Sequence, residues 1–311
     1  EEIEKLTRYL RENIININLT GGEPFLREDI YEITRAYFRN AGVRSVVIPT
    51  NGMRTDAVQS FLDRFVASGL TGRVLISVSF DDLEEEHDRN RGVEGLFENA
   101  LKTYRLVASY RSPNVGVGAG ITVTDKNYPN VLALYRYLKD EGVTSVTACL
   151  MREEGRITEI DIEDKKKMLQ AYRRLTELID ADRRSESVIG RWDDLFDRLI
   201  DAKNKMLYEK VAQTYLTGEF VMPCRAGSLF GVIRPDGDVY PCEIIDCKIG
   251  NLRDYGMDFK KLWKSEQAKK CRWFIRKSKC RCSYECAWTF NIISRPGLAF
   301  RILFDAVIRK K

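Results

Sequence analysis

The sequence predicts an α/β fold with parallel strands, and three observations support that prediction. Strand-like apolar runs alternate with helical segments at intervals of about 30 residues, which favours parallel strands joined by right-handed crossovers. Polar or charged residues stand at the carboxyl ends of five successive strands: Glu23, Asn51, Asp81, Asn127 and Arg152. The 311 residues, 44% apolar and 31% charged, describe a soluble globular protein with one large core or one large and one small core.

Each predicted element follows from its local pattern. The predicted strands cover residues 14–20, 43–48, 73–80, 115–123 and 144–150, and the predicted helices cover residues 27–41, 55–68, 93–110 and 128–141, with a longer helical region after the last strand. The first residues also form a helix, with Ile3, Leu6 and Leu10 on one face. Helix caps favour Asn and Asp as well, but (β/α) barrels build their active sites at the carboxyl ends of strands. We therefore expect the polar strand ends to share one site.

The first strand ends in a turn with unusual residues. Gly21 and Gly22 let the backbone come close to a ligand. Pro24 is rigid and fixes the position of Glu23, whose carboxylate suits a cationic amine. A plain strand-to-loop turn is the alternative interpretation.

A dinucleotide-binding fold is disfavoured. Gly116, Gly118 and Gly120 form a G-x-G-x-G pattern, but they lie within the fourth predicted strand and no helix opens after them.

The eight cysteines are unevenly distributed, with Cys149 first and the other seven between Cys224 and Cys286. The first residues lack a signal-peptide pattern, and no apolar run reaches the ~18–20 residues of a membrane span. We therefore expect a cytoplasmic protein in a reducing setting, where clustered cysteines favour metal or redox chemistry over disulfides. Cys149 itself lies in an apolar strand and is predicted to be part of the core.

Several motifs together resemble the radical S-adenosylmethionine (SAM) enzymes. They are Gly21-Gly22-Glu23-Pro24, Pro49-Thr50-Asn51-Gly52, Ser77-Val78-Ser79-Phe80-Asp81 and His87-Asp88-Arg89-Asn90-Arg91-Gly92. The resemblance implies an α/β partial (β/α)6 TIM-like barrel over residues 1–215, with its first strand missing. It also implies that Gly21, Gly22, Glu23 and Pro24 bind the amine of SAM, and that Ser77 and Ser79 hold its ribose and carboxylate. Weaker candidates for SAM binding are Thr50, Asn51, Thr122 and Arg152.

His87 is the chain's one histidine. We expect it to have a structural role rather than to act as a base, and we predict no catalytic side chain in the sequence.

The C-terminal third adds a cysteine pattern. Cys224 and Cys242 form C-x12-G-x4-C around Gly237, and Cys280, Cys282 and Cys286 form C-x-C-x3-C. Thiolates are soft ligands that suit an Fe–S cluster or zinc. The turn at residues 235–238 joins two short strands, which brings Cys224 and Cys242 together.

This pattern resembles the SPASM or twitch extension of radical SAM enzymes, which carries auxiliary [4Fe-4S] clusters. Fewer cysteines are present than in a full SPASM block, so we expect one auxiliary cluster in a small α+β domain over residues 216–295, followed by a helical tail over 296–311. The expected ligands are Cys224, Cys242, Cys282 and Cys286, with Cys280 able to replace one of them. Cys247 and Cys271 are expected to be buried or spare thiols, although either could serve as a fourth ligand.

The catalytic cluster of the family needs three further cysteines, usually C-x3-C-x2-C, after the first strand. The sequence has no cysteine before Cys149. We expect a fragment of an active enzyme rather than a degenerate one, so the catalytic [4Fe-4S] cluster belongs to the full-length parent and this chain alone is inactive.

The resemblance implies an oxidoreductase or transferase that cleaves SAM reductively and abstracts hydrogen, with peptide or protein modification as the leading class. A small-molecule substrate (a sugar, aminoglycoside or lipid precursor) is the alternative. An electron donor such as flavodoxin or ferredoxin is the expected partner.

A different class remains open. Residues 259–281 hold ten Lys or Arg and one acid, which describes a solvated helix face or a zinc-stabilised module that binds nucleic acid. In that module, Trp263 and Trp273 would stack on bases.

Overall fold

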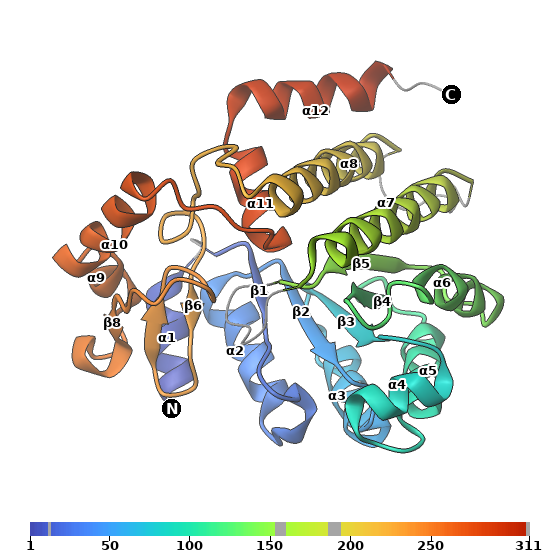
Figure 1. The fold of residues 1–311 in the computed structure, drawn as a ribbon. Coiled ribbons are helices and arrows are strands. Elements are labelled where there is room, and N and C mark those ends of the chain that lie inside the picture. Colours follow the sequence, from blue (N-terminus) through green and yellow to red (C-terminus); the bar gives the residue numbers. More distant parts are fainter. Residues whose placement is uncertain (12–13, 153–159, 186–193, 309–311) are drawn as a thin grey trace. The chain divides into compact units, whose positions relative to one another are not determined.

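The computed structural model describes residues 1–11, 14–152, 160–185 and 194–308 (Figure 1). They form two compact units, one of Glu1–Cys149 with Met257–Lys260 and the other of Leu150–Gly256 with Lys261–Lys311. Within the described ranges, no helix combines the length and the apolar character needed to cross a bilayer.

The first unit is built on a five-stranded sheet whose strands follow one another in chain order. The strands are β1 (Asn16–Asn18), β2 (Ser45–Thr50), β3 (Arg73–Ser79), β4 (Val115–Val123) and β5 (Val146–Leu150). Strands β1 to β4 pair in parallel, with Pro49 opposite Ser77 and Ser77 opposite Gly118. This curled sheet, with a helical segment between successive strands, is part of a (β/α) barrel, as the sequence predicts.

The helices of this unit close one face of the sheet (Figure 1). They are α1 (Glu2–Leu10), the short 3-10 helix η1 (Pro24–Leu26), α2 (Ile30–Ala41), α3 (Thr55–Ala67), α4 (Glu84–Arg91), α5 (Leu96–Ser109) and α6 (Val131–Asp140). Two helices begin three residues later than predicted, α2 at Ile30 and α5 at Leu96, and the short helices η1 and α4 before them were not predicted. Gly92 and Gly95 adopt positive φ between α4 and α5, which separates those two helices.

Alternation along the strands gives the sheet two different faces. Val46 and Ile48 of β2 and Ile76 and Val78 of β3 are fully buried. On the helix-covered side, Phe61 of α3 packs edge-on against Phe25 of η1, with ring centroids 5.7 Å apart. The intervening residues of β2 and β3 are only half-buried. That second face is therefore available for ligands.

The second unit is mainly helical, with one small antiparallel sheet. Its strands are β6 (Val232–Ile233), β7 (Asp238–Tyr240) and β8 (Gly250–Asn251). Its helices are α7 (Ile162–Ser185), α8 (Asp194–Thr217), η2 (Leu252–Tyr255), α10 (Glu266–Lys277), α11 (Glu285–Ile293) and α12 (Pro296–Ile308). Helix α9 (Phe259–Trp263) crosses the boundary between the two units. The predicted hairpin is present, because Gly237 adopts a φ of 86° in the turn between β6 and β7.

Two predictions about cysteines were wrong. Cys149 is exposed, because β5 alternates buried Val146, Ala148 and Leu150 with exposed residues between them. Cys247 and Cys271 form a disulfide, with their Cα atoms 6.0 Å apart, rather than two thiols. Spacing of 24 residues gave no sign of this pairing, which depends on how α10 folds back onto the loop after β7.

Gly52 is predicted to be essential for packing the turn after β2. A Cβ at this position would lie 2.6 Å from the Cα of Ala100 in α5, and its φ is +81°. We expect Gly52→Ala to lower the free energy of unfolding by roughly 2–4 kcal/mol, because the strained φ and the clash with backbone add. Urea denaturation measures this change.

Gly142→Ala is the matched control. Gly142 has a φ of +84° and nothing within 4 Å of its Cβ position, so its substitution costs only the conformational term of about 1 kcal/mol. Equal losses in the two variants would show that α5 does not press on the turn.

Candidate functional site

The turn after β1 is held by the side chain of Glu23. One carboxylate oxygen, Oε1, accepts hydrogen bonds from the Thr50 hydroxyl at 2.8 Å and the Phe25 N–H at 3.2 Å. The other, Oε2, accepts one from the Asn51 N–H at 2.7 Å. Glu23 therefore joins the carboxyl ends of β1 and β2.

These contacts change the interpretation of the turn. The Glu23 carboxylate already has partners at both oxygens, whereas Gly21 and Gly22 are exposed and have nothing within 4 Å of their Cβ positions. Pro24 is buried at the start of η1. The part of the turn open to a ligand is thus the glycine backbone, and Glu23 fixes its position.

A second pair of strand ends is joined in the same way. Asn127 is buried, and its amide donates to the carbonyl oxygens of Asp81 and of Thr122, the latter at 2.8 Å. The side chain of Asn51 accepts from the Met53 N–H at 2.9 Å. The polar side chains at these strand ends therefore form hydrogen bonds with neighbouring backbone groups at the carboxyl-terminal edge of the sheet, without any ligand.

Small residues line the open face of the sheet beside this edge. Ser79 pairs with Gly120 in the register of β3 and β4. A Cβ at Gly120 would lie 3.5 Å from the Ser77 hydroxyl and 4.0 Å from the Thr147 hydroxyl. Hydroxyl groups thus flank the half-buried backbone of Gly120, whereas Gly118, on the same face of β4, is buried.

Sequence reasoning missed part of this face. The glycines of β4 were weighed only as a dinucleotide motif, and Thr147 was not considered. Their alternation along a strand, in register with Ser77 and Ser79, was the available signal.

Arg152 belongs to the second unit and has partners there. Its guanidinium donates to Glu243 at 2.9 Å and lies over the ring of Tyr284, 4.6 Å from the centroid. Leu150, two residues earlier, donates its N–H to Glu285 at 2.7 Å. These contacts hold the segment after β5 against the cysteine-rich part of the chain.

His87 has a structural role. It is buried in α4 against Phe80 and Phe97, and its Nδ1 accepts the N–H of Asp81 at 3.0 Å. Burial lowers the pKa of the imidazole below its usual value, which keeps it neutral. With Nδ1 accepting, the proton lies on Nε2, so no nitrogen is left to act as a base.

Three of the predicted ligand thiols lie together in the second unit. Cys224 and Cys280 are hydrogen-bonded through their sulfur atoms, and both pack against the cluster formed by Ala226, Cys242 and Ile275. Backbone N–H groups of Ala226 and Ile245 donate to the sulfurs of Cys224 and Cys242, each at 3.4 Å. Such N–H groups stabilise the thiolate form that binds iron or zinc.

The pKa values of the Cys224, Cys242 and Cys280 thiols are shifted in different directions. The Cys280 S–H donates to Cys224, which lowers the pKa of Cys224 and raises that of Cys280. Burial raises the pKa of Cys242. In the described part of the chain, no group of three or more His, Cys, Asp or Glu side chains is arranged to hold a metal ion.

The remaining two predicted ligands are placed differently. Cys286 contacts Tyr284, and burial raises the pKa of its thiol. The carbonyl of Cys282 accepts from the indole of Trp288 at 2.9 Å. The structure thus groups Cys280, expected to be a substitute, with Cys224 and Cys242.

Comparison with known families identifies these features. Residues 1–138 match the family model of the radical SAM superfamily, and residues 224–287 match that of SPASM, an iron–sulfur cluster-binding domain. Residues 1–138 therefore belong to the radical SAM superfamily. The first match includes the turn held by Glu23, and the second spans the thiol group from Cys224 to Cys286.

Curated relatives cover different lengths of this chain. An AdoMet-dependent heme synthase of Methanosarcina barkeri is 24% identical over 253 residues, 80% of this chain and 68% of that protein. The Fe-coproporphyrin III synthase of the same organism is 31% identical over 150 residues, 48% of this chain and 35% of that protein. The sporulation killing factor maturation protein SkfB of Bacillus subtilis is 26% identical over 273 residues, 83% of this chain and 57% of that protein. The matched segment is thus well short of the full length of these relatives.

A solved structure shares the fold. Native anSMEcpe with bound AdoMet and the Kp18Cys peptide matches 99% of this chain and 91% of that chain, with a TM-score of 0.58 at 18% identity.

Glu23→Gln tests whether the hydrogen bonds accepted by the Glu23 carboxylate stabilise the turn after β1. The amide nitrogen cannot accept a hydrogen bond, so Thr50 or the Asn51 N–H loses its partner. We expect the free energy of unfolding to fall by about 1–3 kcal/mol in urea denaturation. The same change at exposed Glu28 should cost less than ~0.5 kcal/mol. Equal effects would mean that Glu23 does not hold the turn.

Cys280→Ala tests the thiol pair in the metal-free protein. Without the S–H donor, the pKa of Cys224 should rise, so iodoacetamide should label Cys224 more slowly at pH 7 than in the parent chain. Mass spectrometry of the labelled peptide across pH 5–9 measures the midpoint. Cys149→Ala, in the other unit, should leave that midpoint unchanged. An unchanged pH midpoint for Cys224 labelling in Cys280→Ala would contradict the hydrogen bond between Cys224 and Cys280.

Proposed function

We propose that this chain is part of a radical SAM enzyme that cleaves SAM reductively and abstracts hydrogen from a peptide or protein substrate. The observation that carries the proposal is the pinned turn after β1, which presents glycine backbone at the rim of a face lined with hydroxyl groups. An amine needs hydrogen-bond acceptors, and a ribose needs both donors and acceptors. Backbone carbonyls and serine hydroxyls provide them.

The SAM-binding residues follow from that arrangement. Gly21 and Gly22 hold the amine through their backbone, while Glu23 and Pro24 hold the turn in place. Asn51, Ser77, Ser79 and Thr122 line the rim and open face for the ribose and carboxylate. Arg152 is left out because its guanidinium is paired with Glu243.

The second unit would hold one auxiliary [4Fe-4S] cluster. Cys224, Cys242 and Cys280 are the first three ligands, because their side chains already meet in one apolar group. Cys282 is two residues from Cys280 and is the nearest further thiol in the chain, so it is the proposed fourth ligand. A bound cluster supplies one-electron chemistry, and the N–H groups on the two sulfurs favour its thiolate ligands.

The substrate class rests on the relatives. SkfB is named a maturation protein for a sporulation killing factor and aligns over 83% of this chain, which favours a peptide substrate. The heme synthase alignment over 80% of the chain makes a tetrapyrrole the second candidate. The single histidine is 1% exposed with its Nδ1 engaged, so no histidine is available as a tetrapyrrole iron ligand. This observation supports a peptide as the leading candidate.

The chain by itself is proposed to bind SAM without cleaving it. Reductive cleavage needs the catalytic cluster, and residues 1–148 contain no cysteine to ligate it.

Anaerobic reconstitution with iron and sulfide tests the cluster assignment. We expect about four iron atoms per chain and a broad absorbance shoulder near about 400 nm. Cys224→Ala and Cys242→Ala should each lose most of the iron, because each removes a thiolate ligand, whereas Cys149→Ala should retain it. A colourless protein with one stoichiometric zinc would instead support the zinc-stabilised module.

Calorimetric titration tests the SAM site on the same protein. Gly22→Ala should weaken SAM binding about tenfold, or about 1.4 kcal/mol, because a methyl group would occupy the open space above the backbone. Gly297→Ala, also in open space but in α12, is the control. Unchanged SAM affinity in Gly22→Ala would reject the site, and tight binding of iron coproporphyrin III would move the tetrapyrrole ahead of the peptide.

A further inference from the structure

Helix α12 presents an apolar stripe to solvent. Five of its large apolar side chains are exposed, at the spacing i, i+3, i+4, i+7 and i+8 that places them on one face of a helix. They are Phe300, Leu303, Phe304, Val307 and Ile308, and we call them the α12 stripe. Phe300 is 67% exposed and Phe304 is 53% exposed, and their rings stack with centroids 6.4 Å apart. The stripe is therefore one apolar surface rather than a set of scattered residues.

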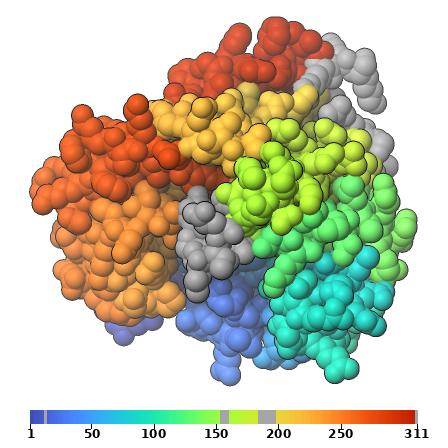
Figure 2. All heavy atoms as spheres, viewed as in Figure 1, coloured from blue at the N-terminus to red at the C-terminus, as the bar shows by residue number. Residues whose placement is uncertain are grey.

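The opposite side of α12 packs within the second unit. Ile302 and Ala306 are buried on that side, and the helix lies along α8 (Figure 1). In Figure 2, α12 is coloured red and reaches the molecular surface. Packing against α8 therefore holds the helix in place and leaves the stripe facing outward.

Basic residues accompany the stripe. Arg301 is exposed near the middle of α12, and it forms no ion pair with any residue that the structure describes. Residues 309–311, which follow the helix in the sequence, are all basic, and residues 295–311 hold five basic residues and one acid, Asp305. Exposed apolar side chains next to unneutralised cations are typical of a helix that lies in the interface of an anionic bilayer. The apolar side chains enter the acyl region of such a bilayer, and the cations contact its headgroups.

A second copy of the chain fits the α12 stripe less well than an anionic bilayer does. Arg301 lies near the middle of the helix, so an antiparallel pair of α12 helices would bring two Arg301 side chains close together. A parallel pair would instead bring together the basic residues at 309–311. Like charges at a contact oppose association, whereas an anionic lipid surface attracts all of these cations.

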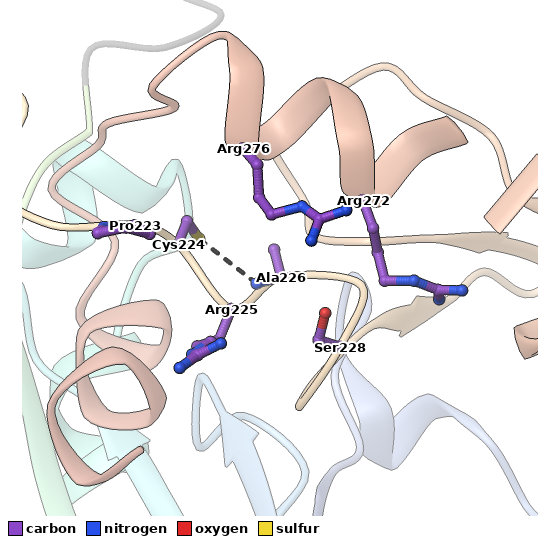
Figure 3. Close-up of a pocket in the computed structure, with 7 residues that line it drawn as sticks. All are labelled: Pro223, Cys224, Arg225, Ala226, Ser228, Arg272 and Arg276. Carbon is purple, nitrogen blue, oxygen red and sulfur yellow. Dashed lines mark hydrogen bonds between the residues drawn. The ribbon is translucent and has the colours of Figure 1, made fainter. Parts of the chain in front are cut away.

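Helix α10 of the same unit carries exposed aromatic residues without an apolar stripe. Trp273 is 57% exposed and Phe274 is 48% exposed, but exposed basic side chains surround them along the helix. Two further cations of α10, Arg272 and Arg276, line a hollow beside Cys224 (Figure 3). Charged rather than apolar side chains dominate this helix, so its two aromatic residues are a matched control for Phe300 and Phe304.

We propose that the α12 stripe is a membrane-association surface that enters the headgroup and outer acyl region of an anionic bilayer. Arg301 and the basic residues at 309–311 would contact the lipid phosphates. The described helix has 13 residues, a length of about 20 Å, so it lies in the plane of the bilayer rather than across it. The inference does not depend on the proposed function, because α12 lies outside both matched segments, residues 1–138 and 224–287.

Sedimentation of the full chain with lipid vesicles tests the proposal. Vesicles of phosphatidylcholine with about 30% phosphatidylglycerol should pellet the chain, and pure phosphatidylcholine vesicles should bind it about tenfold more weakly, because neutral lipid does not attract the cations. The double variant Phe300→Ser and Phe304→Ser should weaken binding to the anionic vesicles about tenfold or more, because less apolar surface enters the bilayer. Arg301→Glu should weaken the same binding severalfold.

The control variant Trp273→Ser and Phe274→Ser removes two aromatic rings of similar exposure from α10. It should bind the anionic vesicles within about twofold of the parent chain, and urea denaturation checks that both double variants are folded, as expected for exposed positions. Failure of the parent chain to bind anionic vesicles, equal binding to neutral and anionic vesicles, or equal losses in the two double variants would each overturn the proposal. A lipid-free dimer of the parent chain that is lost in the Phe300→Ser and Phe304→Ser variant would overturn it as well, because it would assign the stripe to a second copy.

Discussion

The carboxylate of Glu23 is the contact on which the rest of the site depends. Its two oxygens accept from Thr50, the Asn51 N–H and the Phe25 N–H, so one side chain fixes the ends of two parallel strands and the start of η1. A charged acceptor suits this purpose, because hydrogen bonds to ionised groups are stronger than those between neutral groups. The backbone of Gly21 and Gly22 can remain exposed because the Glu23 carboxylate, rather than the glycines, fixes the turn.

The same principle operates along the rim of the sheet. Asn127 joins the ends of β3 and β4 through carbonyl groups, and it is buried while doing so. Parallel strands bring their carboxyl ends to one edge, where backbone groups have no further strand residue to pair with. Polar side chains at these positions satisfy the backbone first. The surface left over, made of serine hydroxyls and glycine backbone, is what a ligand can use.

In the second unit, position rather than residue type distinguishes the cysteines. Cys224 and Cys280 share a proton, Cys247 and Cys271 share a bond, and Cys286 faces Tyr284. Helix α10 takes part in the first two arrangements, because Cys271 and Ile275 lie one turn apart on its buried side. The helix therefore links the disulfide to the apolar cluster around the thiols.

The family was predicted from the resemblance of several motifs, whereas local patterning was enough to predict the parallel strands, the helical crossovers and the hairpin at residues 235–238. Those features depend on period-2 and period-3.6 alternation and on glycine at fixed offsets, which a sequence displays directly. The partners of Glu23, the disulfide, the exposed side of β5 at Cys149 and the grouping of Cys280 with Cys224 were decided by the tertiary structure. Each depends on which distant segments meet, and segments separated by 24 or more residues in the chain meet only through packing that no local pattern encodes.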